Sequence, residues 1–258
     1  MTDESTLQQP RILVWDLPTR AFHGLLTVSV LGAFAISVLA DDESRVFPWH
    51  MLLGAVAAFL VVLRVVWGVV GSRYARFGSF VFGATAVLAY AKGIFTGKGE
   101  RHLGHNPGSS VAIFAMLGLT LGVVLTGALM STSGEVVKEL HEVFAFSLIG
   151  VIAAHVLGVI VHTVRRRENI ALSMLDGRKQ GEKAQAIPSA HPLVAAALLG
   201  LTALWSVGLV GGYDAASRSV VLPGLGVRLA LGEAEGSERS GGDSAKPGRG
   251  KQHHDDRD

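Results

Sequence analysis

Five long apolar segments, separated by polar connections, dominate the hydrophobic pattern of this chain. Each has about the 20 residues with which an α-helix crosses the ~30 Å hydrocarbon core of a bilayer. The segments cover residues 21–40, 50–70, 109–130, 142–164 and 192–212. The pattern therefore predicts an all-α integral membrane protein with five transmembrane helices. A cleaved signal peptide is not expected, because the apolar sequence starts only after residue 20 and runs longer than a signal h-region.

Two further segments have patterns of their own. Residues 77–95 are apolar but short and interrupted by glycines, which predicts a helix lying on the cytoplasmic surface. A sixth span there would invert the rest of the chain and place the arginine cluster 165–167 outside. Residues 213–258 are predicted to form a largely disordered tail, since their last part is rich in glycine and charge. Within the tail, two interpretations of SVVLPGLGVRLALG stay open: it packs at the outer surface, or it contacts a partner.

Composition narrows the class of protein. Hydrophobic residues make up 49% of the chain and the mean hydropathy is +0.41, which indicates a protein embedded in membrane lipid. The absence of cysteine excludes disulfides, thiolate ligands and a covalently attached c-type haem. The net charge is only +2 and no basic module is interleaved with aromatics, so no nucleic-acid partner is expected.

Positive charges are distributed unevenly among the connections. They gather before the first span, between spans two and three, and after span four, whereas the other two connections carry only Arg45 and Lys138. The positive-inside rule therefore places residues 1–20 in the cytoplasm and the 213–258 tail on the opposite side. The basic residues on the inner side are Arg11, Arg20, Arg73, Arg76, Lys92, Lys98, Arg101, Arg165, Arg166, Arg167, Arg178, Lys179 and Lys183.

Histidines are the most informative polar residues within the spans. His141 and His155 lie fourteen positions apart in one uninterrupted apolar stretch. On a helix they are therefore about 40° apart in rotation and about 21 Å apart along the axis. A histidine inside a membrane helix is costly enough to indicate function. Two on one face, separated by much of the hydrocarbon core, indicate two ligand sites, one near each membrane surface.

The predicted topology supplies a partner for each of these histidines. His50 opens the second span at the depth of His141, and His23 lies at the cytoplasmic start of the first span, at the depth of His155. Each pair presents two imidazoles from different helices, the arrangement that holds an iron between axial ligands in a four-helix bundle. Zinc fits less well, because it requires three or four clustered protein ligands. We therefore predict two non-covalent, bis-histidine haem b groups.

Arginines are candidates for binding the haem propionates, since a guanidinium matches the geometry of a carboxylate. Arg64 and Arg20 are the two selected. Arg73 and Arg76, on the same side, are also candidates, but a role as ordinary positive-inside residues is favoured for them. Arg64 lies within the second span, about four turns after His50. Arg20 lies just before the first span. Snorkelling to the interface is the alternative for Arg64, and a role as an ordinary positive-inside residue is the alternative for Arg20.

Other histidines leave alternatives open. His162 lies seven residues after His155, hence on nearly the same face, and spacing alone does not exclude it as the ligand opposite His23. His102 and His105 lie in a glycine-containing loop and are interpreted as surface or proton-exchanging groups.

Four stretches of the chain are distinctive: VWDLPTRAFHG, WHMLLGAVAAFLVVLRVVWGVVGSRYARF, GHNPGS and LHEVFAFSLIGVIAAHVLGVIVHTVRRRENI. They resemble the bacterial dihaem cytochrome b561 family, most closely the branch with b-type subunits of nickel–iron hydrogenases. The resemblance implies a haem-binding four-helix bundle over 21–180, with His23, His50, His141 and His155 as ligands. It favours His155 over His162, because related chains carry an extra, non-ligating histidine there. Gly24 departs from the family, which commonly has tryptophan after the first ligand.

The resemblance also implies a function. The chain is expected in the bacterial cytoplasmic membrane, passing respiratory electrons between quinone and a periplasmic c-type cytochrome or catalytic redox subunit. It would be an electron-transfer component of a quinol:acceptor oxidoreductase, because six-coordinate iron leaves no open position for oxygen chemistry. The alternatives are a membrane anchor for a catalytic subunit, and a haemless transporter or scaffold.

The quinone is expected near the cytoplasmic edge, where the resembling hydrogenase subunits meet it. That edge offers histidines as proton acceptors, whereas the periplasmic edge offers carboxylates such as Glu142.

Overall fold

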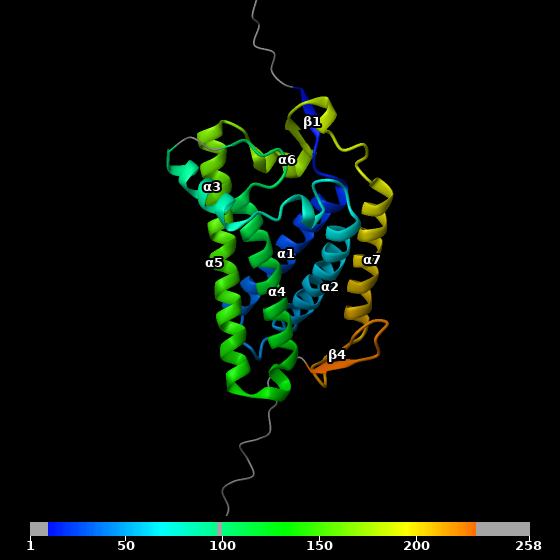
Figure 1. Cartoon of the computed structure of the whole chain (residues 1–258). Coiled ribbons are helices and arrows are strands. Elements are labelled where there is room, and N and C mark those ends of the chain that lie inside the picture. The colour runs from blue at the N-terminus through cyan, green and yellow to red at the C-terminus, as the bar shows by residue number, and fades with distance from the viewer. Residues whose placement is uncertain (1–9, 97–99, 231–258) are drawn as a thin grey trace, which may run out of the picture.

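Five long helices run side by side through the molecule (Figure 1). The structure is a computed structural model that describes residues 10–96 and 100–230. All five helices are long and apolar enough to cross a membrane, which confirms the predicted helical membrane fold with five spans. They are α1 (Leu17–Leu39), α2 (Pro48–Val70), α4 (Pro107–Ser133), α5 (Glu135–Arg166) and α7 (Pro192–Gly211).

The starts of these helices are set by local sequence. A proline stands in the first turn of α1, α2, α4 and α7, where its missing N–H costs no hydrogen bond. Asp16 caps α1, because its side chain accepts a 2.8 Å hydrogen bond from the backbone N–H of Thr19. Asn106 and Ser109 form a reciprocal capping box at the start of α4.

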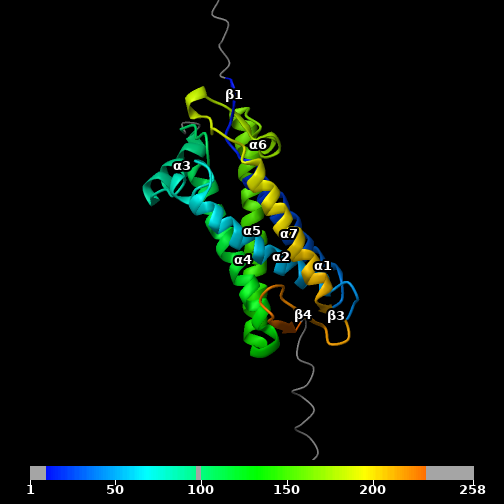
Figure 2. The same cartoon turned by 90° about the vertical axis from the view of Figure 1, so that its right-hand side faces the viewer.

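Helices α4 and α5 form a tight hairpin with only Gly134 between them, at a φ of 70° that favours glycine. The α5 helix begins at Glu135, seven residues before the predicted span, because the polar residues before the apolar stretch extend the helix. It packs along α4, while α1 packs along α2. Figure 2 shows α2 and α7 inclined to this hairpin.

Helix α7 lies against α1 and α2. Leu198 of α7 forms one buried cluster with Phe22 of α1 and Leu60 of α2. The fifth span is therefore an added helix on one side of the bundle formed by α1, α2, α4 and α5.

Small elements cover one end of the bundle, called here the β1 end (Figure 1). Strand β1 pairs antiparallel with β2, which brings the chain before α1 beside the chain after α6. The segment predicted as one surface helix over 77–95 consists of a short 3-10 turn and a separate helix. The elements at this end are β1 (Arg11–Leu13), η1 (Phe77–Ser79), α3 (Ala84–Thr96), α6 (Ile170–Asp176), β2 (Arg178–Gln180) and η2 (Lys183–Gln185).

A three-stranded antiparallel sheet covers the opposite end, called here the β4 end. Its strands are β3 (Tyr213–Asp214), β4 (Ser219–Val221) and β5 (Arg228–Ala230). Val220 packs against Leu52 of α2 and Leu209 of α7. The first part of the segment predicted as a largely disordered tail thus forms a sheet on the bundle. The rest of that prediction, over 231–258, lies outside the described residues.

Candidate haem-binding site

The rings of His50 and His141 face each other between α2 and α5, near the β4 end. Their centroids are 6.2 Å apart and their planes are inclined by 71°. A metal bound by imidazole lies about 2 Å from the ligating nitrogen, so two rings on opposite sides of one metal have centroids about 6 Å apart. The observed separation therefore fits one iron held between these two histidines.

Hydrogen bonds to neighbouring helices orient both rings. The Nδ1 of His50 lies 2.8 Å from the carbonyl oxygen of Ala33 on α1. The Nδ1 of His141 lies 3.0 Å from the carbonyl oxygen of Val123 and 3.1 Å from Oγ1 of Thr126, both on α4. A carbonyl oxygen only accepts, so Nδ1 carries the proton in each ring and Nε2 is left with its lone pair for a metal.

A glycine on α4 leaves room for the His141 ring. A Cβ at Gly127 would lie 3.2 Å from Cε1 of His141, tighter than ordinary packing. The outer pair, His50 and His141, is thus positioned by two neighbouring helices, α1 and α4. Neither the carbonyl partners nor Gly127 could be identified from the sequence pattern, because they depend on the rotation of α1 against α2 and of α4 against α5.

The inner pair, His23 and His155, lies between α1 and α5 on the side of the β1 end. The two residues are electrostatic neighbours, but His23 is exposed and α1 and α5 are not among the closely packed helix pairs. Added Cβ atoms at Gly24 and Gly158 would meet nothing within 4 Å. The backbone at these two exposed glycines is therefore open to the approach of a flat macrocycle.

His162 has different neighbours from His155. The charged groups around it are Lys179, Glu168, Arg166 and Arg101, at the β1 end. His23 is among the electrostatic neighbours of His155 and not among those of His162.

The two arginines predicted to bind propionates lie in different surroundings. Arg64 is only 7% exposed, and its Nη2 donates a 3.1 Å hydrogen bond to the carbonyl oxygen of Ala75. Its Nη1 is buried and has no hydrogen-bond partner among the described residues. Arg20 instead donates through Nε to the carbonyl oxygen of Met174, near the end of α6, at 3.2 Å. Arg64 therefore keeps a buried donor that suits an anionic group.

His105 is half-buried and its Nδ1 atom is shielded from solvent, unlike the open surface group that was expected. Its ring lies between Trp15, at 4.6 Å between centroids, and Phe80, at 4.2 Å. Burial, as the largest cause, and the positive charges of Arg64 and Lys179 together lower the pKa of His105 to about 3. In the sequence, His105 lies in the GHNPGS stretch that carries part of the family resemblance, and this position was the available sign of a role beyond a surface loop.

A charged network joins the loop before α4 to the segment after α5. Arg101 forms a 3.1 Å salt bridge with Glu168, and Nζ of Lys179 donates to the carbonyl oxygen of His102 at 3.2 Å. Burial alone would raise the pKa of Glu168, but Arg101 and Lys179 hold it below its ordinary value. Burial lowers the pKa of Lys179, against the opposing effect of Glu168. The network fixes the loop that carries His105.

Comparison with known proteins identifies a family for most of the bundle. The family described as prokaryotic cytochrome b561 matches residues 14–177, more than half of the chain, and this range contains all four predicted ligands. No curated protein and no solved structure gives a significant match.

Proposed function

Since the chain belongs to the prokaryotic cytochrome b561 family, and is thus a membrane b-type cytochrome in electron transfer, we propose that it carries electrons between the two membrane faces. Two haem b groups would be held at different depths, one by the outer pair and one by the inner pair. This membership also disfavours the haemless transporter or scaffold.

Each residue of the proposed site has a defined task. The four histidines would supply the imidazole ligands from α1, α2 and α5. In the outer pair, the hydrogen bonds at Nδ1 fix the ring orientation and raise the basicity of the ligating nitrogen. Arg64 would bind a propionate through its unpartnered Nη1. Haem itself supplies a one-electron couple, whose potential the protein sets through these ligands and their surroundings.

The observation that carries this proposal is the separation of 6.2 Å between the rings of His50 and His141. The test is the absorption spectrum and the haem-to-protein ratio of the purified chain. We expect a b-type spectrum and two haems per chain. His50→Ala or His141→Ala should remove one haem, and His23→Ala or His155→Ala the other.

His162→Ala is the control for the ligand assignment, and both haems should remain. Loss of a haem in His162→Ala, with both kept in His155→Ala, would show that the inner ligand is misassigned. A purified chain without a Soret band would contradict the two-haem proposal as a whole.

The orientation in the membrane forms part of this proposal. The charge asymmetry of the connections supports a cytoplasmic β1 end and a periplasmic β4 end in the bacterial inner membrane. A reporter that is active only in the cytoplasm should stay silent when fused after residue 258. Activity there would mean that α7 does not cross the membrane or that α3 does.

For the electron partners, we propose quinone at the β1 end and a c-type cytochrome or catalytic redox subunit at the β4 end. His105 is a poor proton acceptor at neutral pH, because its pKa is about 3. His102 is better placed, in a partly exposed position with its ring near Phe82 and Tyr90. Haem reduction by a quinol analogue should slow in His102→Gln and persist in Glu142→Gln. Slowing only in Glu142→Gln would move quinone to the β4 end.

A further inference from the structure

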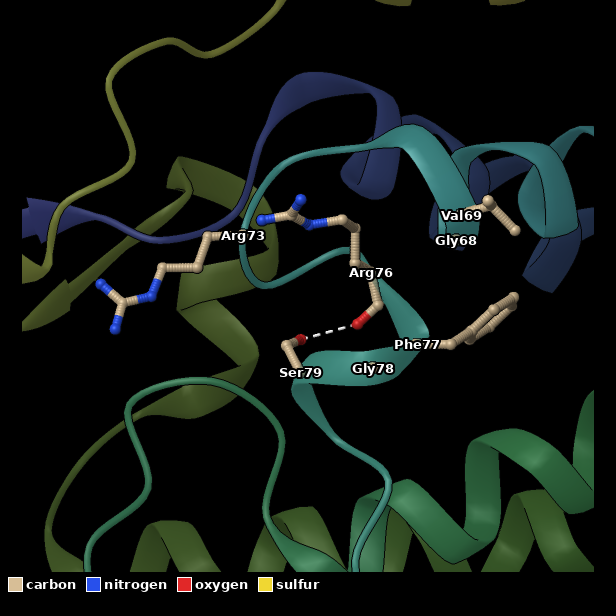
Figure 3. A pocket seen from close by; sticks show the side chains of 7 residues that line it. All are labelled: Gly68, Val69, Arg73, Arg76, Phe77, Gly78 and Ser79. Carbon is tan, nitrogen blue, oxygen red and sulfur yellow. Dashed lines mark hydrogen bonds between the residues drawn. The ribbon is translucent and has the colours of Figure 1, made fainter.

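An open recess of about 570 Å³ lies beside the end of α2, at the β1 end and apart from the four proposed ligands (Figure 3). The last turn of α2, the connection that follows it and η1 form its walls. Its lining residues are Gly68, Val69, Arg73, Arg76, Phe77, Gly78 and Ser79.

The apolar wall of the recess is held in place by α2. A Cβ at Gly68 would lie only 2.2 Å from Cε2 of Phe77, so the ring packs directly on the helix backbone. The guanidinium of Arg64 lies 4.9 Å from the centroid of the same ring, and Phe114 of α4 lies 5.6 Å from it. Val69, which is 66% exposed, continues this wall along the membrane-facing side of α2.

The opposite wall is positively charged. Figure 3 shows the guanidinium groups of Arg73 and Arg76 on one side of the recess and Phe77 and Val69 on the other. Both arginines are exposed, and no carboxylate is among the lining residues. The described salt bridges involve Arg11 and Arg101 instead. Two cationic groups therefore stand beside an apolar surface without an acidic partner in the lining.

We propose that the recess binds the headgroup of an anionic phospholipid. Arg73 and Arg76 bind the phosphate, because a guanidinium forms paired hydrogen bonds to phosphate oxygens. An acyl chain follows Val69 and Phe77 toward the hydrocarbon core. The recess lies where a spanning helix ends, the depth at which headgroups meet basic side chains. A soluble phosphate would leave the apolar wall unused, and this favours a lipid as the occupant.

The test uses the purified haem-loaded protein and native mass spectrometry to count bound lipids. The probes are dioleoyl phosphatidylglycerol, dioleoyl phosphatidylcholine and inorganic phosphate. The double variant Arg73→Gln/Arg76→Gln should bind phosphatidylglycerol about thirtyfold more weakly, from about 1 kcal/mol for each basic residue near the headgroups. The matched control Lys92→Gln/Arg167→Gln removes the same charge from exposed positions at the same end and should keep wild-type affinity.

A further variant tests the apolar wall. Phe77→Ala should weaken the binding of phosphatidylglycerol and leave any weak binding of inorganic phosphate unchanged. The haem content of every variant should equal that of the wild type, which separates failure of this proposal from failure of the electron-transfer function.

Several results would overturn the proposal. These are equal affinity for phosphatidylcholine, equal affinity for inorganic phosphate, and an equal loss in the control variant. Binding of a short-chain quinone that depends on Arg73 and Arg76 would assign the recess to quinone and would also overturn it.

Discussion

The two histidine pairs differ in how far the protein alone holds them in position. In the outer pair, both rings are hydrogen-bonded through Nδ1 to carbonyl oxygens of other helices, and the ring centroids are 6.2 Å apart. In the inner pair, His23 is exposed and its helix is not closely packed against α5. A site that is ordered before binding loses less entropy on binding. We therefore expect tighter haem binding at the outer pair.

The largest expected effect comes from closing the space that the His141 ring occupies. Gly127→Leu places a side chain where even a Cβ approaches Cε1 of His141 to 3.2 Å. The ring should be displaced and the outer haem lost, with one haem retained at the inner pair. The haem-to-protein ratio measures this. Gly200→Leu, on an exposed face of α7 with nothing within 4 Å, is the control and should keep two haems.

A smaller effect is expected when the hydrogen bonding of His141 is weakened. Thr126→Val removes the hydroxyl that lies 3.1 Å from Nδ1 of His141. Loss of such a supporting group lowers affinity at metal sites about tenfold or more. Haem transfer from the outer pair to apomyoglobin should therefore become about tenfold faster. Thr120→Val is the matched control, because the Thr120 hydroxyl donates the same kind of hydrogen bond to a backbone carbonyl, that of Met116, but has no histidine beside it. An equal change in the rate of haem transfer there would point to a general helix defect.

His105, at the β1 end, should make the free energy of unfolding depend on pH. The pKa of His105 is about 3 in the folded chain and about 6.5 when unfolded. The unfolded state thus binds the additional proton between these values, so stability is present above pH 6.5 and falls as the pH decreases toward 3. The slope is about 1.4 kcal/mol per pH unit.

His105→Phe should remove this dependence. Thermal unfolding at pH 7.5 and pH 5.5 measures the change. His102→Phe, in the same loop but without contact to Trp15 and Phe80, is the control and should unfold with the pH dependence of the wild type. An unaltered slope in His105→Phe would mean that another group titrates.

The smallest effect is expected at Gly24, beside the inner pair. A Cβ there would meet nothing within 4 Å, and the resembling family commonly has tryptophan at this position. Gly24→Trp should therefore keep two haems per chain and raise the resistance of the inner haem to extraction. Loss of the inner haem would show that this space is needed by the macrocycle itself.

The hydrophobic pattern was sufficient to predict the five spanning helices, because helices of this length are encoded by consecutive residues. It also placed His50 and His141 at one depth, where the structure brings their rings together. It did not predict the strand pair β1–β2, whose three-residue strands have no local signature and meet across 167 positions. The packing of the His105 ring was missed for the same reason, since Trp15 and Phe80 contact it from other segments of the chain.

The pairing of β1 with β2 has a consequence for biosynthesis. Arg11 leaves the ribosome before its partner Gln180, which follows only after α1, α2, α4 and α5 have been translated. At about 5–20 residues per second, the delay is roughly 8–34 s. During this time the N-terminal strand has no partner, and it pairs only when the four-helix unit is complete. The β1–β2 pair therefore forms only after all four helices of the unit have been synthesised.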